Sequence, residues 1–321
     1  MRHASFFGHA GLHDVDDRAR RGARRSAFAR LPAAAGAASL AAALLACSEE
    51  PAVDGDGAAG PGATSSSSGA GSGAAGGEGG APSSSSAGAG GSGGGGAPSG
   101  GGAPTGGFPD HWIDGTDCGS EPEVMVWQYA EDTFILRQSL CTNFEGPFIY
   151  LLFGEDRALV QDSGTGDADL AGAVQTVVDA WLAAHGKTSI ELVVTHSHSH
   201  GDHVGGDAEL GSLPDAAVVG LSAGAVQAFF GIDAWPTQIV EYDLGGRVLD
   251  VIPIPGHQSA HIALHDRAHD LLLTGDTLYP GRLYIDDWDD YRQSVARLQD
   301  FVGGGNAVTW VLGTHIEMST T

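Results

Sequence analysis

Short apolar runs, rich in β-branched and aromatic side chains, follow one another between Gly and acidic turns from residue 124 onward. Runs of this kind are typical of strands, and the pattern predicts four early ones, at Val124–Tyr129, Thr133–Arg137, Phe148–Phe153 and Ala158–Gln161. The segment Leu170–His185 instead repeats its apolar residues at helical spacing and ends before Gly186, so it predicts a helix.

Beyond residue 190, predicted strands alternate with predicted helices. The strands are expected at Glu191–Thr195, Arg247–Ile252, Leu271–Thr274 and Val308–Leu312, and the helices near Ser222–Phe230 and Asp290–Val302. An opening group of antiparallel strands followed by this alternation predicts an α/β (α+β) domain with two sheets sandwiched between helices. His265 and His269 fall in an expected polar turn before Leu271, where we expect them to be solvated.

The predicted strand at residues 191–195 runs directly into a segment with four histidines and an aspartate within eight positions: His196, His198, His200, Asp202 and His203. Imidazole and carboxylate groups are ligands for a cation such as Zn²⁺. Alternate residues of an extended segment point the same way, so the second and third histidines can converge on one ion. After the turn at Gly201, the Asp-His pair can reach a second ion. A solvated His-rich loop is the alternative, but such a loop is not usually preceded by an apolar strand.

Three further candidate ligands, His257, Asp276 and His315, each follow an apolar run that ends in a turn. Taken singly, a His or Asp at a strand end is more often a cap or a surface group. Strands that carry such residues at one edge of a sheet give the convergence that a two-metal site requires, so these residues and the His-rich segment form a set.

The pattern His198-x-His200-x-Asp202-His203, followed by the three downstream residues, resembles the metal-binding signature of the metallo-β-lactamase-fold hydrolases, which include glyoxalase II and lactonases. The resemblance covers about residues 122–315 and implies a four-layer αββα sandwich. It also implies two Zn²⁺ ions, with other divalent transition metals as substitutes, and Asp276 as the bridge between them. The implied ligands are His198, His200 and His257 for one ion, and Asp202, His203 and His315 for the other.

Counting back from the Asp202–His203 pair fixes this register and leaves His196 without a ligand role. We expect His196 to be a buried strand residue or a hydrogen-bond donor to a ligand, and the same for His261. Two segments support the register, because Val160–Gly164 resembles the family's early strand ending in Asp-x-Gly and Pro255–His261 its Pro-Gly-His segment. The departures are Gln258 and Ala260, in place of the usual Thr and Gly, and Thr314, which is bulkier than expected beside the last His.

Residues 1–46 form an expected export signal, because six arginines between residues 18 and 30 precede an Ala-rich apolar run too short for a membrane span. The ending Leu44-Leu45-Ala46-Cys47 resembles the lipobox of bacterial lipoproteins. It implies that lipidated Cys47 anchors the exported protein to a membrane of the bacterial cell envelope, with an ordinary cleaved signal as the alternative. Residues 47–107, almost entirely Gly, Ala, Ser, Pro and Thr, are expected to be a disordered linker, and residues 108–321 the metallo-β-lactamase-like domain.

The chain has three cysteines. Apart from Cys47, only Cys118 and Cys141 remain, and a pair in an oxidising compartment predicts a disulfide that ties the domain's first strands. Two buried thiols are the alternative.

The chain is strongly acidic, with a formal net charge of −25. Without residues 1–46, eight basic and 37 acidic residues remain, which gives a formal charge of −29. Such a surface repels phosphate, which argues against a nucleic-acid partner and favours a small-molecule substrate. Basic residues for a glutathione-like thioester are scarce, since Lys187 is the only Lys and Arg282 the only Arg close in sequence to a candidate ligand.

The resemblance implies a hydrolase in which a metal-bound hydroxide attacks the carbonyl of a small ester, lactone or thioester. Asp202 is expected to shuttle the proton while remaining a ligand. Tyr279, three residues after Asp276, is expected to reach the developing oxyanion or the leaving group, in a way similar to the Asp-x-x-Tyr of the family's acyl-homoserine lactonases. A packed aromatic residue beside Pro280 is the alternative for Tyr279.

Two other functions stay open: a β-lactam hydrolase and a metal-binding lipoprotein without catalysis. Two-zinc β-lactamases carry Cys or no acidic bridge where this chain has Asp276, and a storage site has no need of a bridging carboxylate. A non-haem iron or flavodiiron protein is a third, weaker alternative, because its acidic replacements in the His-rich segment are not seen. The sequence ends six residues after His315, where the resemblance leads us to expect either a missing substrate wall or a truncated chain.

Overall fold

The structure, a computed structural model, describes residues 29–30 and 107–316. Apart from Ala29–Arg30, the predicted export signal lies outside the described residues, as do Cys47 and nearly all of the predicted linker. Among the helices in the described part of the chain, none has both the length and the apolarity needed to cross a bilayer.

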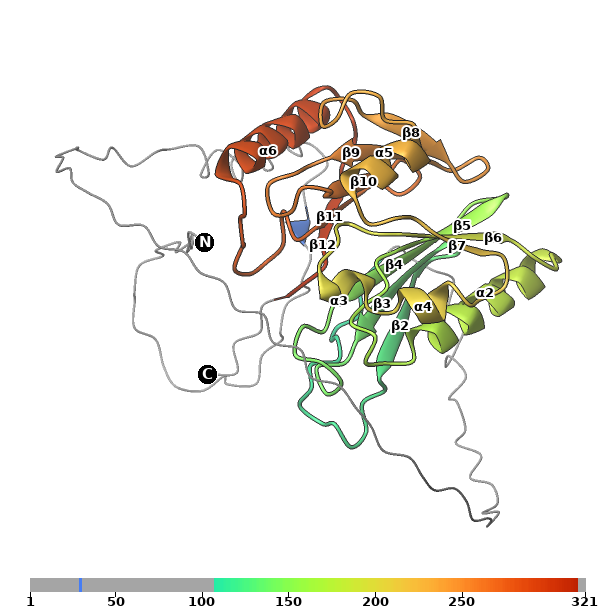
Figure 1. Cartoon of the computed structure of the whole chain (residues 1–321). Helices are drawn as coiled ribbons and strands as arrows, with labels where there is room; N and C mark the ends of the chain where they lie inside the picture. Colours follow the sequence, from blue (N-terminus) through green and yellow to red (C-terminus); the bar gives the residue numbers. More distant parts are fainter. Residues whose placement is uncertain (1–28, 31–106, 317–321) are drawn as a thin grey trace, which may run out of the picture. The chain divides into compact units, whose positions relative to one another are not determined.

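The first of two six-stranded sheets has the strand order β2-β3-β4-β5-β6-β7 (Figure 1). Neighbours from β2 to β5 pair antiparallel, whereas β5, β6 and β7 pair parallel. The carboxyl ends of β5 and β6 therefore lie at the same edge of the sheet. The strands are β2 (Val124–Ala130), β3 (Thr133–Gln138), β4 (Phe148–Phe153), β5 (Arg157–Gln161), β6 (Glu191–Thr195) and β7 (Ala216–Val218).

The second sheet has the order β1-β12-β11-β10-β9-β8. Only β11 and β12 pair parallel, so these two strands also end at one edge. The strands are β1 (Ala29–Arg30), β8 (Val240–Asp243), β9 (Val248–Pro253), β10 (Ile262–Asp266), β11 (Leu271–Gly275) and β12 (Trp310–Gly313).

Two sixteen-residue helices flank the sheets, α2 (Leu170–His185) and α6 (Trp288–Gly303). The carboxylate of Asp169 accepts a hydrogen bond from Gly172 N at the start of α2, and Gly186 ends that helix in the left-handed conformation. Asp287 caps α6 in the same way as Asp169 caps α2. Shorter helices are α3 (Gly201–Val204), α4 (Asp207–Leu210) and α5 (Ala223–Phe230).

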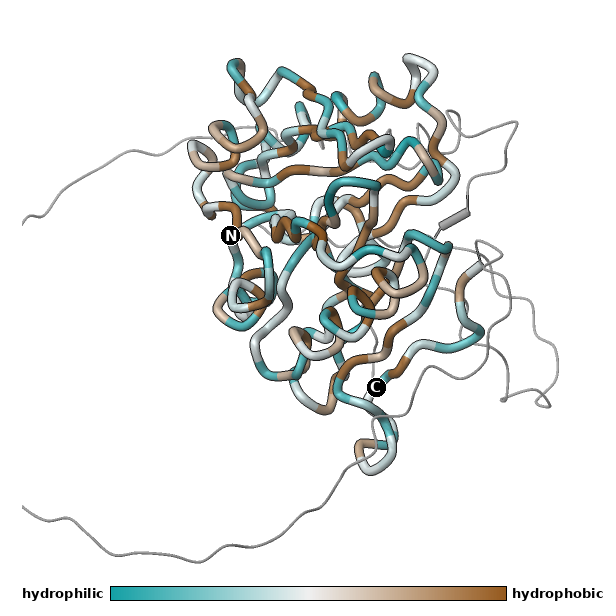
Figure 2. Tube along the Cα trace, turned by 90° about the vertical axis from the view of Figure 1, so that its right-hand side faces the viewer, coloured by the Kyte–Doolittle hydropathy of each residue, from teal (hydrophilic) through white to brown (hydrophobic). Residues whose placement is uncertain are grey.

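Three hydrophobic clusters define the layers. One cluster lies between the sheets, joining residues such as Ile135 and Tyr150 to Val251 and Leu273. A second cluster packs α2 against the outer face of the first sheet, and a third packs α6 against the outer face of the second. Hydrophobic stretches follow the strands in Figure 2 and hydrophilic ones the connecting loops. The predicted four-layer αββα sandwich is confirmed.

Most predicted elements are present, and α2 and β6 have the predicted ends. The sequence pattern missed β7, β8 and β10 and the two single-turn helices α3 and α4. β7 has only three residues, and β8 alternates apolar and acidic residues, so neither shows the longer apolar run that marks most other strands.

The expectation that His265 is solvated is wrong, because His265 lies in β10 and is buried. Its Nδ1 lies 2.9 Å from Asp250 Oδ2 on the paired strand β9, and its Nε2 lies 2.7 Å from the carbonyl oxygen of Ala307. Cross-strand pairing thus satisfies the polar atoms that made the segment look like a turn. His269 is partly buried and lies 2.7 Å from Asp132 Oδ1.

The predicted disulfide between Cys118 and Cys141 is present, with the two Cα atoms 5.5 Å apart. It ties the segment before β2 to the loop between β3 and β4, residues 139–147.

Arg247, at the start of β9, links the two sheets through a buried guanidinium group. It donates to both carboxylate oxygens of Asp266 on β10, at 3.1 and 2.6 Å. It also donates to Thr133 Oγ1 and to the carbonyl oxygens of Asp132 and Phe153 in the first sheet. Because the charge is paired and its donors are used, removing it leaves several buried acceptors without partners.

We expect Arg247→Ala to lower the free energy of unfolding by about 3–5 kcal/mol, because it leaves the buried Asp266 carboxylate uncompensated. Urea denaturation of the full chain, followed by tryptophan fluorescence, measures the change. Lys187→Ala, which removes an exposed cation, is the control and should change stability by less than about 0.5 kcal/mol. A similar loss in both variants would contradict the assigned role of Arg247.

Candidate metal centre

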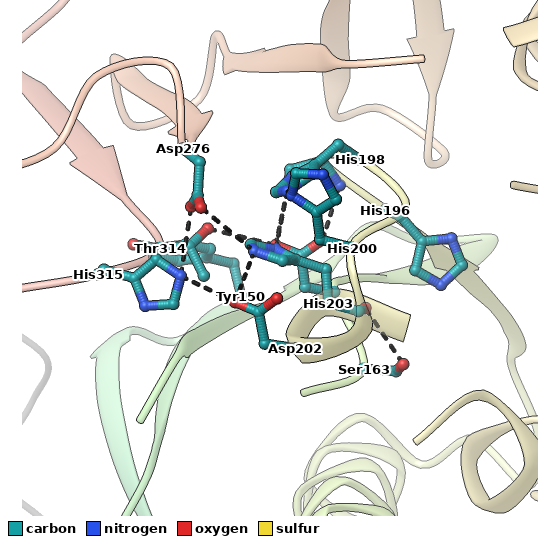
Figure 3. A network of polar contacts seen from close by, with 12 residues as sticks. Tyr150, Ser163, His196, His198, His200, Asp202, His203, Asp276, Thr314 and His315 are labelled. Carbon is teal, nitrogen blue, oxygen red and sulfur yellow. Dashed lines mark hydrogen bonds and ion pairs between the residues drawn. The ribbon is translucent and has the colours of Figure 1, made fainter. Parts of the chain in front are cut away.

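All seven predicted ligands meet at the edge where the strands of both sheets end (Figure 3). They come from four segments: the loop after β6 with α3, the turn after β9, the end of β11 and the end of β12. The ligand atoms form two groups, each with all its atoms within 4.8 Å of one another. The first group is His198, His200 and His257, and the second is Asp202, His203, Asp276 and His315.

In the first group, three imidazole nitrogens form a nearly equilateral triangle. His198 Nε2 lies 2.9 Å from His200 Nδ1, and His257 Nε2 lies 3.0 Å from each of them. Burial and the nearby His203 lower the pKa of His198 well below its usual value, and burial lowers that of His257. These two side chains are therefore neutral near pH 7 and offer lone pairs to a cation.

In the second group, carboxylates surround two histidines. His203 Nε2 lies 3.2 Å from Asp202 Oδ2, and His315 Nε2 lies 3.1 Å from the same oxygen. Burial opposes a charge on His315, but Asp276 and Asp202 outweigh it and raise the pKa of His315 to about 9. Burial likewise opposes a charge on His203, and Asp162 with Asp276 raises its pKa well above the usual value.

Asp276 lies between the two groups. Its Oδ2 is 3.6 Å from His257 Nε2 in the first group and 3.6 Å from His203 Nε2 in the second, and its Oδ1 is 3.4 Å from His315 Nε2. Burial alone would raise the pKa of Asp276, but the positive charges of His203 and His315 lower it well below its usual value. One carboxylate thus faces both groups in ionised form.

The donor set fits transition-metal ions. Nitrogens bound to one tetrahedral Zn²⁺ at about 2.0–2.1 Å lie about 3.3 Å apart, close to the separations in the first group. In the second group, His203 Nε2 and Asp276 Oδ1 are buried and make no hydrogen bond. Buried polar atoms rarely lack partners, and a metal ion is a partner that suits both.

The buried carboxylate of Asp162, the residue that follows β5, holds the segments that carry the candidate ligands. It accepts hydrogen bonds from Ser197 N at 2.7 Å and Ser197 Oγ at 3.0 Å, and its Oδ2 lies 3.0 Å from His203 Nδ1. Ser197 Oγ is in turn 3.1 Å from His198 Nδ1. Sequence analysis assigned Asp162 to a family motif but predicted no contact for its side chain, because its contacts join segments 35 or more residues apart.

His196 is not among the two groups, and its ring points away from them in Figure 3. It is buried, and its Nε2 lies 2.7 Å from Asp207 Oδ1, which also accepts a hydrogen bond from Ser163 Oγ at 2.7 Å. His196 therefore holds the loop that carries the ligands, in agreement with the expected buried role. Asp207 was not singled out in the sequence, although an acidic residue after the Gly-Gly turn was a visible signal.

His261 is also buried, and its ring stacks on that of His198 with centroids 4.7 Å apart. Burial and the neighbouring His257 lower the pKa of His261 well below its usual value. This neutral ring fixes the plane of a candidate ligand, as expected for a supporting residue.

The three departures from the family pattern are accommodated locally. Gln258 accepts a hydrogen bond from Ala260 N at 2.7 Å and donates to Ser199 Oγ at 2.8 Å, so it braces the turn that holds His257. Thr314 is buried and donates to Asp162 Oδ2 at 3.3 Å, which uses its bulk to tie the His315 segment to the same carboxylate.

Tyr279 lies beside the second group, with its ring centroid 5.7 Å from that of His315. Its hydroxyl donates to the carbonyl oxygen of Arg282, so the side chain is held within its own loop. The position is close to the candidate metal centre, as the sequence predicted, while the hydroxyl bonds to the protein backbone.

Comparison with known proteins decides the family. A model of the Metallo-beta-lactamase superfamily matches residues 142–309, which is more than half of the chain. The chain belongs to the metallo-beta-lactamase superfamily. Members of this superfamily usually bind metal, in keeping with the two groups of His and Asp residues described above.

Relatives of this superfamily member include named hydrolases. A hydroxyacylglutathione hydrolase of Ectopseudomonas mendocina is 36% identical over 140 residues, which covers 42% of this chain and 51% of the relative. An acyl-coenzyme A thioesterase of Gallus gallus is 30% identical over 209 residues, which covers 53% of this chain and 72% of the relative. A solved metallo beta lactamase from Hirschia baltica shows a TM-score of 0.44 at 15% identity, covering 61% of this chain and 92% of that structure. The chain spans about half the length of the hydroxyacylglutathione hydrolases that it matches.

We expect the two ligand groups to differ in proton release when this superfamily member, stripped with a chelator, is titrated with Zn²⁺. His198 and His257 have lowered pKa values and are already neutral, whereas His203 and His315 have raised pKa values and must lose protons. The tighter equivalent should release about zero protons and the weaker one about one or two. The weaker affinity should fall more steeply between about pH 8 and about pH 6. Calorimetry in two buffers of different ionisation enthalpy counts the protons, and equal release for both equivalents would contradict the assignment.

The register of the His-rich segment is tested by two matched variants. His198→Ala should remove at least one bound metal ion per chain, because it takes a nitrogen from the first group. His196→Ala should keep the wild-type metal content, because its ring contacts Asp207 and none of the candidate ligands. Elemental analysis after dialysis measures the content, and loss of metal in His196→Ala alone would reverse the register.

Proposed function

We propose that the protein is a metal-dependent hydrolase that cleaves a small ester, lactone or thioester at a two-zinc centre. Membership of the superfamily supports hydrolysis as the reaction class, and relatives named as a hydroxyacylglutathione hydrolase and an acyl-coenzyme A thioesterase support an acyl compound as the substrate. The observation that carries the proposal is the position of Asp276 between the two ligand groups.

A shared carboxylate favours catalysis over storage. Each of the two groups could bind an ion without a carboxylate that faces the other group, so a closed storage site gains little from Asp276. A dinuclear centre that acts on water benefits, because the carboxylate holds two cations at a fixed separation. The first group offers three nitrogens, which leaves one position of a tetrahedral ion for water or substrate.

Two divalent cations bound here would supply Lewis acidity and lower the pKa of a water molecule towards neutrality. Asp202 receives the proton in our proposal. Its side chain is 19% exposed, against 9% for Asp276, so it is the more accessible carboxylate of the second group. A carboxylate within hydrogen-bond reach of both the water and the leaving group can pass the proton from one to the other.

Tyr279 is proposed to donate a hydrogen bond to the developing oxyanion or to the leaving group. Its ring lies against His315, which supports proximity to the reacting atoms. Its hydroxyl would have to exchange the carbonyl oxygen of Arg282 for the substrate. Supporting residues such as His261 and Asp162 keep the ligand rings fixed while the substrate changes.

Asp276→Ala is expected to reduce kcat/KM by at least about 100-fold, since even outer partners of a metal site account for losses near that size. The assay uses zinc-loaded full chain against a panel of lactones, thioesters, phosphoesters and lactams, with metal content measured in parallel. Asp179→Ala, on the exposed face of α2, is the matched control and should retain activity. Absence of hydrolysis across the panel by the wild type, or full activity of Asp276→Ala, would refute the proposal.

A further inference from the structure

Most of the Asp, Glu, Arg and Lys residues in the loops around the candidate metal centre are acidic. They hold nine Asp or Glu residues and a single Arg or Lys, Arg282, in the described segments 139–147, 162–169, 196–207, 254–261, 276–287 and 314–316. Arg282 is exposed on the loop after β11.

Five of these carboxylates are neither candidate ligands nor paired with a histidine: Glu145, Asp167, Asp169, Asp286 and Asp287. Asp169 and Asp287 accept hydrogen bonds from backbone N–H groups as helix caps, which leaves their charge in place. Arg282 alone offsets these five charges within the segments. The approach to the metal centre therefore carries a negative field.

Three of these acidic residues have backbone contacts with candidate ligands or their neighbours. The carbonyl oxygen of Glu145 is 3.1 Å from His315 Nδ1. The backbone N–H groups of Asp286 and Asp287 both donate, at 2.9 Å, to the carbonyl oxygen of Gly256, the residue before His257.

Aromatic surface is exposed on two of these loops and at the first residue of α6. Phe144 is 81% exposed, Tyr284 51% and Trp288 43%. Phe144 adjoins Glu145, and the carbonyl oxygen of Tyr284 lies 2.7 Å from His257 Nδ1. Trp288 stacks on Tyr291, whose backbone packs against Gly256. Large exposed aromatic side chains beside a reactive centre favour contact with an apolar ligand group.

We propose that the substrate of this site is an acyl compound without negative charge, whose apolar part contacts Phe144, Tyr284 and Trp288. The inference rests on the proposed function. Hydrolysis breaks the bond from the acyl carbon to oxygen or sulfur, forms a bond to the oxygen of water and gives the proton to the departing group. Thioesters of glutathione or coenzyme A are anionic, so the loops disfavour them by repulsion.

A matched substrate series tests the charge rule with zinc-loaded full chain. The substrates are aryl thioesters of one apolar acyl chain whose ring carries a trimethylammonium, a carboxamide or a carboxylate group. At low salt we expect kcat/KM to fall in that order, by roughly tenfold per unit of charge. The differences should shrink in about 1 M salt, where the Debye length is about 3 Å.

The outcomes separate this inference from the proposed function. The inference is overturned if the enzyme prefers the carboxylate substrate, or if salt does not change the differences in kcat/KM. Either result leaves the hydrolase proposal standing. Hydrolysis of none of the three, together with none of the earlier panel, refutes the hydrolase proposal and the inference with it.

Two lysine variants locate the repulsion. Asp286→Lys should raise kcat/KM for the carboxylate substrate at low salt by about tenfold relative to the carboxamide. Glu155→Lys makes the same change in net charge in the turn between β4 and β5, at the opposite end of these strands, and should alter the ratio less than about twofold. Equal effects would show that the total charge, and not the loop after β11, sets the preference.

A separate pair tests the apolar contact with neutral thioesters of a short and a long acyl chain. Phe144→Ala should reduce the preference for the long chain by roughly five- to tenfold, because part of its apolar surface loses a partner. Phe229→Ala removes a less exposed phenylalanine on α5, outside the ligand loops, and should leave the preference unchanged. An unchanged preference in Phe144→Ala would overturn the assigned contact.

Discussion

The buried carboxylate of Asp162 is the constraint on which the candidate metal centre depends. It lies at the end of β5 with a backbone φ of 71°, a conformation that non-glycine residues adopt at a cost. That backbone turn aims the carboxylate at Ser197, His203 and Thr314, which belong to the segments after β6 and β12. A fully buried carboxylate needs hydrogen-bond donors or an opposite charge, so the three segments cannot move apart without leaving it unpaired in the interior.

The same carboxylate explains the charge distribution above it. Asp162, Asp202 and Asp276 surround His203, and together they raise its pKa well above the usual value despite its burial. Three carboxylates within one buried cluster would repel one another without positive charge among them. Protons on the histidines and metal ions are two ways to supply that charge, so protonation of the histidines and metal binding compete at this site.

The sequence predicted what local pattern determines. The ends of α2 follow from the Asp169 cap and Gly186. The family resemblance implied the set of candidate ligands, in the register that the Asp202–His203 pair selects, and these residues come together in the structure. The two-sheet sandwich followed from the order of strands and helices, and the family resemblance led to the same fold.

What the sequence did not predict depends on pairing between distant residues. The end of β10 looked polar because it contains His265 and Asp266. Their partners are Asp250 on β9 and Arg247 just before β9, which only the folded sheet brings together. The contact of His196 with Asp207 likewise spans the loop and α3, and no period in the sequence reports it. Buried polar networks are satisfied by tertiary partners, so they are the features least visible in a one-dimensional pattern.

In the function proposed above, chemistry and specificity belong to different residues. The candidate ligand groups lie at strand ends and on α3, where Asp162, Ser197 and His261 hold them in place, and these residues would serve the hydrolysis of many carbonyl compounds. Selection among such compounds would then fall to the loops beyond those strand ends. Here those loops present Glu145 and Asp286 together with exposed aromatic rings. Both features favour the class of ligand proposed above, an acyl compound with an apolar part and no negative charge. A relative with the same ligand groups and basic loops would favour anionic substrates, so shared chemistry does not imply shared substrates.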